Sequence, residues 1–389
     1  MKLFDHIPLI QNFIKTRNSN FYKKTPSGFK FYLNGNRSYR FEAGIRDLEN
    51  AILRAKDDEF PSREVLYTIY ESCNDLHVKS QMRTAVFKVI SQPWVIVDQK
   101  GKPQKSLTEL LKKKWFDSLN KHIIETEFWG HSLIYFSFEN HEITHTKLFP
   151  RMHVSPEKQS LIPDLSRPDK LISYVDNNLF ESVFIEVGHN NDLGLFQDIM
   201  RHCILKTYSL KDWARSSEKW GDPHVILQSA SQNEHENDEK EAFLKNFGNN
   251  GYAIIDKDDD VKLLERSAAG NSHHIFLDFI KLHNEESSKG INGQVATADE
   301  NAFVGSAEVQ ERILNDYTKS RLRSLMYFHN EITLPFLINY NQGQNVYQDF
   351  KNMKWMPKSF MEEEQKTSQT LKEEPQIQMP QNSSIDPFG

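Results

Sequence analysis

The stretch Ser288-Lys289-Gly290-Ile291-Asn292-Gly293-Gln294 decides the fold, because it separates two helical patterns within residues 271–341. The apolar side chains before it recur at the spacing of one helical face: Ile275, Phe276, Phe279 and Leu282. Two glycines three residues apart and an asparagine remove helix-favouring residues and permit positive φ. The sequence therefore predicts a helix over residues 271–287 and a small polar loop over residues 288–302.

A second helix is expected after this loop. Gly305-Ser306-Ala307-Glu308 has the form of a helix start, with Ser306 as the N-cap and the acidic Glu308 in the first turn. Neither glycine nor proline follows until Pro335, and the apolar residues in between keep a helical spacing: Val309, Ile313, Tyr317, Leu322, Leu325, Phe328 and Ile332. Roughly 30 residues can form one rod about 45 Å long. We therefore expect a long helix within residues 303–340 that ends at Pro335.

Composition limits the class of protein. The 389 residues carry a net charge of -6, with 38% hydrophobic and 26% charged residues, and can bury one large core or a few smaller ones. No apolar run approaches the roughly 20 residues that cross a bilayer, and the N-terminus lacks a secretory signal, so we expect no membrane contact. Cys73 and Cys203 are interpreted as small buried hydrophobes in a reducing compartment. The negative charge argues against a protein that wraps duplex DNA, but it is compatible with a surface past which DNA slides.

The first half of the chain mixes helix and strand patterns. Within residues 1–60, residues 29–33, the turn Asn34-Gly35-Asn36 and residues 39–41 predict a β-hairpin. Helical periodicity covers residues 61–89 and 107–128, and strands are expected at residues 94–96, 132–136, 143–149 and 180–187. This mixture predicts an α+β domain.

A further long helix is predicted before the decisive stretch. It starts after Leu193-Gly194, carries Trp213 and ends at Trp220-Gly221-Asp222-Pro223, because glycine permits a left-handed cap and proline lacks the donor to continue. Residues 223–270 then form an excursion that holds a predicted short helix at residues 240–247. Two strands, at residues 251–256 and 261–265, follow it and are joined by an acidic turn at residues 257–260. From about Met356 onward, acidic residues and repeated prolines predict a disordered tail.

Three motifs resemble the Mu-like phage portal family, over roughly residues 75–341. The most specific is Trp213-x4-Glu218-Lys-Trp220-Gly221-Asp-Pro223, which is similar to the family's Trp-x4-Glu-x-aromatic-Gly-x-Pro pattern. A second motif resembles the family's helix end, loop and helix start. The helix end corresponds to Lys289, the loop to Gly293-Gln294 and Thr297, and the helix start to Gly305-Ser306. The helix with Asp75, His77 and Arg83, followed by Trp94-Val-Ile96, resembles its early signature. The motif residues expected to be structural are Trp213, Glu218, Trp220, Gly221, Pro223, Gly293, Gly305 and Ser306.

The resemblance implies an α+β portal fold, with an α/β wing, a helical stem, a small α/β clip and a long wing helix after a tunnel loop. The implied segments are an N-terminal segment (1–60), the first part of the wing (61–192), the first stem helix (193–222), the clip (223–270), the second stem helix (271–287), the tunnel loop (288–302), the long wing helix (303–340) and a C-terminal segment (341–389).

The resemblance also implies a function without enzymatic activity or a cofactor. Portal proteins form a homo-oligomeric, dodecameric ring at one capsid vertex, through which double-stranded DNA enters during packaging and leaves during ejection. The implied partners are the large terminase, a head-tail adaptor or connector and the major capsid protein, and the implied locations are the virion and, during assembly, the host cytoplasm. Lys289, Asn292 and Gln294 are the candidates for contact with DNA in the channel. The alternative for these three residues is a simple interhelical loop.

Two other functions are weighed against a portal: another neck or capsid adaptor, and a metal-dependent nuclease. His273-His274 point about 100° apart on a helix and do not readily chelate one ion. The acidic turn at residues 257–260 lacks the glycine and the distant glutamate of a calcium loop. Neither a phosphate-binding Gly-x4-Gly-Lys-Ser/Thr loop nor a Gly-x-Ser-x-Gly elbow occurs. We therefore expect no metal and no catalytic residue.

Overall fold

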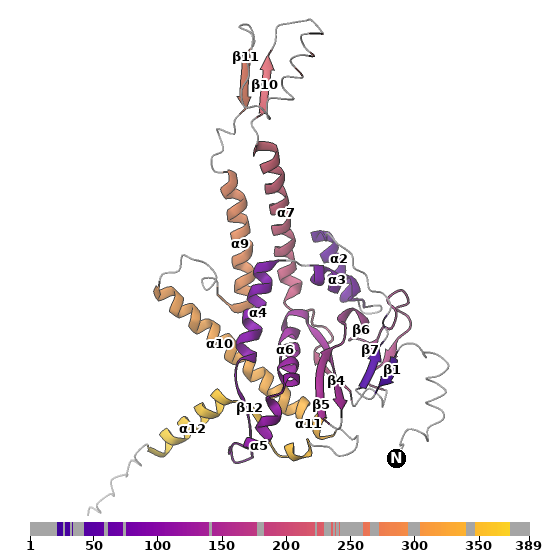
Figure 1. The fold of residues 1–389 in the computed structure, drawn as a ribbon, viewed down its shortest axis with the longest axis vertical. Coiled ribbons are helices and arrows are strands. Elements are labelled where there is room, and N and C mark those ends of the chain that lie inside the picture. The colour runs from indigo at the N-terminus through magenta and orange to yellow at the C-terminus, as the bar shows by residue number, and fades with distance from the viewer. Residues whose placement is uncertain are drawn as a thin grey trace, which may run out of the picture.

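A computed structural model gives the architecture of the chain. It describes residues 22–25, 28–31, 33, 43–57, 61–72, 75–139, 142–176, 183–221, 224–228, 235, 238, 241, 260–264, 272–294, 304–339 and 347–373. Within these residues a body of helices and strands carries a long helical hairpin at one end (Figure 1).

Helices fill one side of the body. They are α2 (Ile45–Ala55), α3 (Glu64–Ser72), α4 (Leu76–Ile90), α5 (Lys105–Thr108), the 3-10 turn η1 (Glu109–Leu111) and α6 (Lys114–Trp129). Helix α4 starts where it does because the Asp75 carboxylate accepts hydrogen bonds from the backbone N–H groups of His77 and Val78. The apolar faces of these helices join one buried cluster that includes Leu66, Val89 and Leu119.

Strands cover the other side of α6. The main sheet has the antiparallel order β5-β4-β9, with β5 (Glu142–Leu148), β4 (His131–Glu139) and β9 (Phe184–Gly188). The Thr146 hydroxyl of β5 donates to the backbone carbonyl of Trp115, which ties α6 to the sheet at 2.9 Å. A smaller sheet follows the 3-10 turn η2 (Arg151–His153) and contains β6 (Val154–Ser155), β7 (Ser160–Leu161) and β8 (Ile172–Ser173). Helices and strands thus pack as the predicted α+β body, which confirms that expectation.

The N-terminal strands form a pairing that the sequence did not predict. Strand β2 (Gly28–Phe31), which overlaps the predicted strand at residues 29–33, pairs antiparallel with the preceding β1 (Tyr22–Thr25). Phe31 packs against the rings of Tyr135, Phe149 and Phe184, which anchors β2 on a second buried cluster. The predicted turn at residues 34–36 and the returning strand at residues 39–41 lie outside the described residues.

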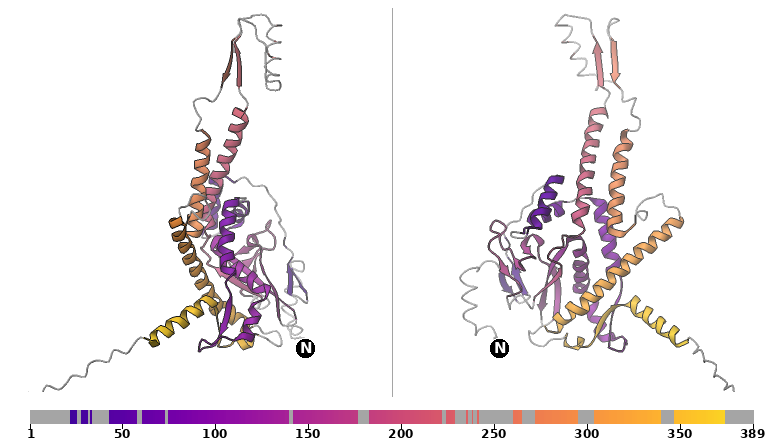
Figure 2. Two further views of the ribbon diagram at one scale, coloured as in Figure 1. Left: turned by 60° about the vertical axis from the view of Figure 1, so that its left-hand side comes forward. Right: turned by 180° about the vertical axis from the view of Figure 1, so that it is seen from behind.

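The helical hairpin consists of α7 (Phe196–Gly221) and α9 (Ser272–Asn292), and both views in Figure 2 agree that they run side by side. At its far end, β10 (His224–Gln228) pairs antiparallel with β11 (Asp260–Leu264). The strand predicted at residues 261–265 exists, but its partner is His224–Gln228, a strand that the sequence analysis missed. The predicted strand at residues 251–256 and turn at 257–259 lie outside the described residues, as does almost all of the predicted helix at 240–247.

The long helix crosses the body obliquely and passes through Pro335. Helix α10 (Val304–Phe328) continues into a π-helical turn, His329–Thr333, and then into α11 (Leu334–Ile338). A π turn shifts the hydrogen-bond register by one residue, and Pro335 lies at the start of α11, where no intrahelical donor is required. The expectation that the helix ends at Pro335 is therefore wrong, and so is the expectation that Ser306 is its N-cap, because α10 begins at Val304.

The C-terminal segment is ordered beyond the predicted point. After the 3-10 turn η4 (Gln348–Phe350), β12 (Lys354–Pro357) pairs with β3 (Trp94–Val97) and leads into α12 (Lys358–Glu373). Trp355 is fully buried, and its ring packs on those of Phe116 and Phe350 at 5.6 and 5.4 Å. The prediction of disorder from Met356 is wrong as far as Glu373. Burial of one tryptophan on a short strand outweighs the acidic composition that follows it.

Candidate functional site: the helical hairpin and its base

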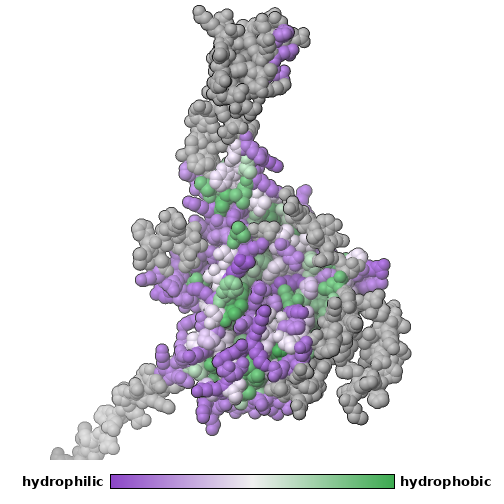
Figure 3. Space-filling model, in the orientation of Figure 1, coloured by the Kyte–Doolittle hydropathy of each residue, from purple (hydrophilic) through white to green (hydrophobic). Residues whose placement is uncertain are grey.

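The outer part of the hairpin is held by aromatic stacking, whereas much of its apolar surface faces outward. The rings of Trp213 and Phe276 lie 6.3 Å apart and almost parallel, at 5°. Other apolar side chains on the two helices are exposed: Tyr208 and Leu210 on α7, and Ile275, Phe279 and Leu282 on α9. Figure 3 shows hydrophobic surface interspersed with polar surface along this projection. The predicted apolar stripe of α9 is thus real, but the chain leaves most of it uncovered.

Polar side chains meet where the hairpin joins the body. The two Nδ1 atoms of His202 on α7 and His283 on α9 lie 2.9 Å apart, so one imidazole donates and the other accepts. Burial, followed by the charges of His202 and Lys206, lowers the pKa of His283. The Nε2 atom of His283 is buried and has no hydrogen-bond partner. If His283 donates through Nδ1–H, its buried Nε2 carries a lone pair and no N–H group is left there without an acceptor. This tautomer of His283 is therefore favoured.

Lys206 connects α7 to two other helices at the same level. Its ammonium group lies 2.8 Å from an oxygen of Asp75, the residue that caps α4, and it donates to the Asn284 side-chain oxygen of α9 at 2.6 Å. Both members of the Lys206–Asp75 pair are largely buried. Because removing one partner would leave the other charge in a poorly solvated site, the pair fixes the angle at which α7 leaves the body.

Helix α9 ends in a socket formed by α4 and α10. The Asn292 amide donates to the side-chain oxygen of Gln81 at 2.7 Å, and His77 shares a hydrogen bond with Ser288. Arg321 of α10 donates to both carboxylate oxygens of Glu127, at 2.7 and 2.8 Å, and to the backbone carbonyl of Ile291. Such a bidentate contact fixes both position and orientation.

The last turn of α9 also requires a glycine. Gly293 has a φ of +69°, and a Cβ atom there would lie 2.5 Å from the ring of Tyr317 on α10. The left-handed conformation and the close approach of the ring both exclude a larger residue. This is the physical reason for the glycine in the motif of the decisive stretch.

The structure places the three predicted DNA-channel residues differently from the expectation. Lys289 and Asn292 lie within α9, which continues to Asn292 through Gly290, so the predicted helix end at Ser287 is wrong. Asn292 and Gln294 are buried, with 0% and 4% of their surface exposed, and they are not available to a ligand in this chain. Lys289 is exposed and forms an ion pair with Glu286 at 2.7 Å. The three residues therefore do not form one exposed loop.

The motif residues near Trp213 belong to the outer half of α7. Trp213 stacks on α9, Glu218 is exposed, and the helix ends at Gly221 as expected. Trp220 and Gly221 lie in the last turn of α7, whereas Pro223 lies outside the described residues. Gly305 and Ser306 lie in the first turn of α10.

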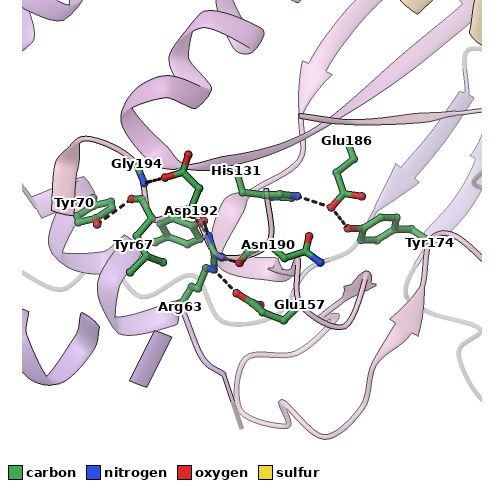
Figure 4. A network of polar contacts seen from close by, with 11 residues as sticks. Arg63, Tyr67, Tyr70, His131, Glu157, Tyr174, Glu186, Asn190, Asp192 and Gly194 are labelled. Atoms are coloured by element: carbon green, nitrogen blue, oxygen red, sulfur yellow. Dashed lines mark hydrogen bonds and ion pairs between the residues drawn. The ribbon is translucent and has the colours of Figure 1, made fainter. Parts of the chain in front are cut away.

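A second polar network, which the sequence analysis missed, holds the start of α7 against the strands (Figure 4). Arg63 donates to the backbone carbonyls of Asn190 and Asp192 and lies 2.6 Å from the Glu157 carboxylate. The same loop contains Gly194, with a φ of +71°, where a Cβ atom would lie 2.3 Å from the backbone nitrogen of Gly130. The arginine and the glycine together fix the loop from which α7 starts.

Beside this loop, His131, Glu186 and Tyr174 form a chain of hydrogen bonds (Figure 4). Burial lowers the pKa of His131, an effect partly offset by Glu186. His131 is 1% exposed, so this histidine is not accessible to a ligand and its hydrogen bond stabilises the sheet. Within the part of the chain that the structure describes, no group of three His, Cys, Asp or Glu side chains is placed to hold a metal ion. No helix among the described residues is long and apolar enough to cross a membrane.

The comparison with family models identifies one family. The family model described as the portal protein of Mu bacteriophage matches residues 67–378, most of the chain. No functionally curated protein matches the sequence.

The solved structures that match are distant in sequence. A chain of the virion of a native gene transfer agent (GTA) particle is 9% identical, with 84% of this chain and 94% of that chain covered and a TM-score of 0.53. A chain of the neck of an empty GTA particle, computed with C6 symmetry, is 8% identical, with 86% and 97% covered and a TM-score of 0.51. An HK97-family phage portal protein from Corynebacterium diphtheriae is 10% identical, with 81% and 98% covered and a TM-score of 0.43.

Proposed function

The chain belongs to the family of portal proteins of Mu bacteriophage, and we propose that its copies close into a ring at one vertex of a phage capsid, through which double-stranded DNA is packaged and ejected. The observation that carries this proposal is the family match, which spans the hairpin, its base and the long helix. The fold that the chain shares with chains of a GTA virion and neck supports it.

The uncovered apolar faces of the hairpin support closure into a ring. Exposed large apolar side chains on both helices of the projection are available to a neighbouring copy: Leu210 on α7, and Ile275 and Leu282 on α9. In a ring of identical subunits each copy presents two different faces to its two neighbours. We assign the α7 face and the α9 face to these two contacts, and we propose twelve copies in the capsid from the family resemblance.

The hairpin is the proposed stem, and the β10–β11 ribbon at its far end belongs to the proposed clip. A two-stranded ribbon at the tip of two long helices lies far from the body (Figure 1). We propose that the large terminase and, after packaging, a head-tail adaptor dock there in turn. The major capsid protein would contact the body, which is the proposed wing. During assembly the chain would reside in the host cytoplasm.

The proposal assigns no chemical step to this chain. The work of DNA movement would come from the terminase, and the ring would supply a passage. Of the three residues predicted to meet DNA, Lys289 alone is exposed on the described surface and remains the candidate. Its ion pair with Glu286 reduces the local positive charge, which suits a duplex that must slide rather than bind.

Imaging and mass measurement of the purified full chain test this proposal. We expect negative-stain images to show rings with a central hole and radial wings, and native mass spectrometry to give a mass of about twelve chains, as the family resemblance implies. A chain that stays monomeric at high concentration, in both measurements, would overturn the proposal. Omission of the chain from a capsid assembly reaction should give shells that do not fill with DNA.

A further inference from the structure

Exposed lysines gather at the end of the body opposite the hairpin. We call this region the lysine surface, and its exposed members are Lys100, Lys102, Lys105, Lys112, Lys114, Lys351 and Lys354. They lie on and around β3, α5, the start of α6 and β12, which Figure 1 places at the lower end of the body, with the hairpin at the upper end. A concentration of one charge sign is unexpected in a chain with a net charge of -6.

The backbone brings these lysines together from two distant parts of the sequence. Strand β12 pairs with β3 so that Lys354 lies opposite Val97. The chain then turns back at once, because the Asp98 backbone N–H donates to the carbonyl of Lys102 and the Gln104 N–H donates to that of Ile96. Lys100 and Lys102 therefore lie on a tight turn beside Lys354, and α5 begins directly afterwards at Lys105.

The nearby carboxylates neutralise little of this charge. Asp98 accepts hydrogen bonds from the backbone N–H groups of Lys102 and Lys100, which lower its pKa, and the charge of Lys100 lowers this pKa further. Lys112 forms one exposed ion pair, with Glu109. Among the residues that the structure describes, no carboxylate lies within ion-pair distance of the remaining members: Lys100, Lys102, Lys105, Lys114, Lys351 and Lys354.

Local stability accounts for one of the two lysines at the start of α6 but not for the other. Lys113, the N-cap of this helix, forms an ion pair with Glu142 of β5, whereas Lys114, its first residue, is exposed. The N-terminus of a helix carries a partial positive charge, so cations there are unfavourable, whereas an anion is favourable. Lysines at this position cost stability in the free chain and add to the binding of an anion.

We propose that the lysine surface binds the phosphate backbone of double-stranded DNA, without sequence preference and outside the channel. Lysine ammonium groups act as point charges on phosphate, and several of them side by side match a linear polyanion. The proposal rests on the function proposed above. If the tip of the hairpin meets the packaging motor outside the capsid, the opposite end faces the interior, where packaged DNA accumulates. An acidic protein segment is the competing occupant.

A closed circular duplex separates this surface from the channel. Relaxed, covalently closed plasmid DNA cannot thread a ring that has already closed, so binding to it reports only on outer surfaces. The test compares the assembled wild-type chain with a triple variant, Lys100→Gln, Lys102→Gln and Lys105→Gln. A matched control changes three exposed lysines elsewhere, Lys56→Gln, Lys158→Gln and Lys170→Gln, and removes the same net charge.

We expect the wild type and the control to bind the circle and the triple variant to bind at least about ten-fold more weakly at 0.1 M salt. The logarithm of the binding constant falls linearly with the logarithm of the salt concentration, and each phosphate contact contributes about 0.9 to the slope. The slope of the triple variant should therefore be smaller in magnitude than that of the wild type by about 2 to 3. The proposal is overturned if the wild type does not bind the circle, if both triple variants lose affinity equally, or if polyglutamate binds in place of DNA. Ring formation is measured separately by native mass, so failure of the portal proposal is distinguishable.

Discussion

The body and the hairpin differ in how much of their apolar surface the chain itself covers. In the body, the aromatic rings of Trp94, Phe116 and Trp355 are buried against one another. In the hairpin and its base, His283 and Asn292 are buried, and the apolar stripe of α9 is exposed. A helix that buries polar groups and exposes apolar ones gains little from packing within its own chain.

This difference indicates which part of the fold a single chain stabilises by itself and which part needs contacts with other copies. The body has an apolar core that suffices for folding. The inner end of the hairpin joins this core through Ile199, Ile204 and Ile291, and polar contacts such as Lys206–Asp75 lie beside them, whereas the outer part leaves apolar side chains exposed. We infer that neighbouring copies complete the hairpin, and the predictions below test this division.

The largest effect is expected from a tryptophan of the body. Trp355→Ala removes a fully buried ring and should lower the free energy of unfolding by about 3–5 kcal/mol. The matched change in the hairpin, Trp213→Ala, removes a half-buried ring that stacks on Phe276 and should cost only about 1 kcal/mol. Urea unfolding of both variants, followed by circular dichroism, measures the difference. Equal losses would show that the hairpin contributes as much to the fold as the body does.

Two glycines with opposite expected signs sharpen the comparison. Gly194→Ala places a Cβ atom 2.3 Å from the backbone of Gly130 at a positive φ, and should destabilise the chain by about 2–3 kcal/mol. Gly290→Ala lies within α9, where a Cβ atom meets nothing within 4 Å, and should stabilise by about 0.5–1 kcal/mol because alanine favours helix. Thermal unfolding of both variants measures the signs. A loss of stability in Gly290→Ala would mean that α9 ends before this residue.

Acid should destabilise the body through His329. Burial lowers the pKa of this histidine to about 3, whereas an unfolded histidine has a pKa of about 6.5. Below pH 6.5 the unfolded chain takes up a proton that the folded chain excludes, so stability is full above that pH and is lost as the pH falls toward 3. At pH 5 the loss should be about 2 kcal/mol.

The variant His329→Gln tests this assignment. It removes the difference in proton uptake, and its stability should fall less between pH 7 and pH 5 than that of the wild type, measured by urea unfolding at each pH. The control His189→Gln changes an exposed histidine and should leave the wild-type pH dependence in place. Parallel pH profiles for the wild type and His329→Gln would contradict the assignment.

The sequence allowed prediction of the elements whose apolar residues face the chain's own core. Strand Trp94–Val97, the strand at residues 132–136 and the end of α7 at Gly221 were expected, because periodicity and glycine position report directly on local geometry. The continuation of α9 through Gly290 was not expected. A glycine weakens a helix by only about 1 kcal/mol, and the contacts of Asn292 with α4 and of Ile291 with Arg321 outweigh that cost.

The polar contacts at the base of the hairpin could not be predicted from one sequence. His283, Ser287, Ser288 and Asn292 recur at helical spacing, a pattern that normally marks a solvent-exposed face. In the structure this face is the buried one. Whether a polar face is buried depends on partners far along the chain, such as His202 and Gln81, and their contacts depend on the tertiary fold. The same dependence explains why two of the three predicted DNA-channel residues are buried.

The smallest effect on the folded chain should accompany the largest effect on assembly. Ile275 on α9 and Leu53 on α2 are both 69% exposed, so replacing either by serine should change the free energy of unfolding by less than about 0.5 kcal/mol. If neighbouring copies cover the hairpin, Ile275→Ser removes about 1.5–3 kcal/mol of burial at each contact between subunits, and the concentration for ring assembly should rise ten-fold or more. Leu53→Ser should assemble as the wild type does in sedimentation velocity experiments. Equal weakening by both variants would mean that the apolar face of the hairpin is no more important to assembly than that of the body, and the division between the two regions would fail.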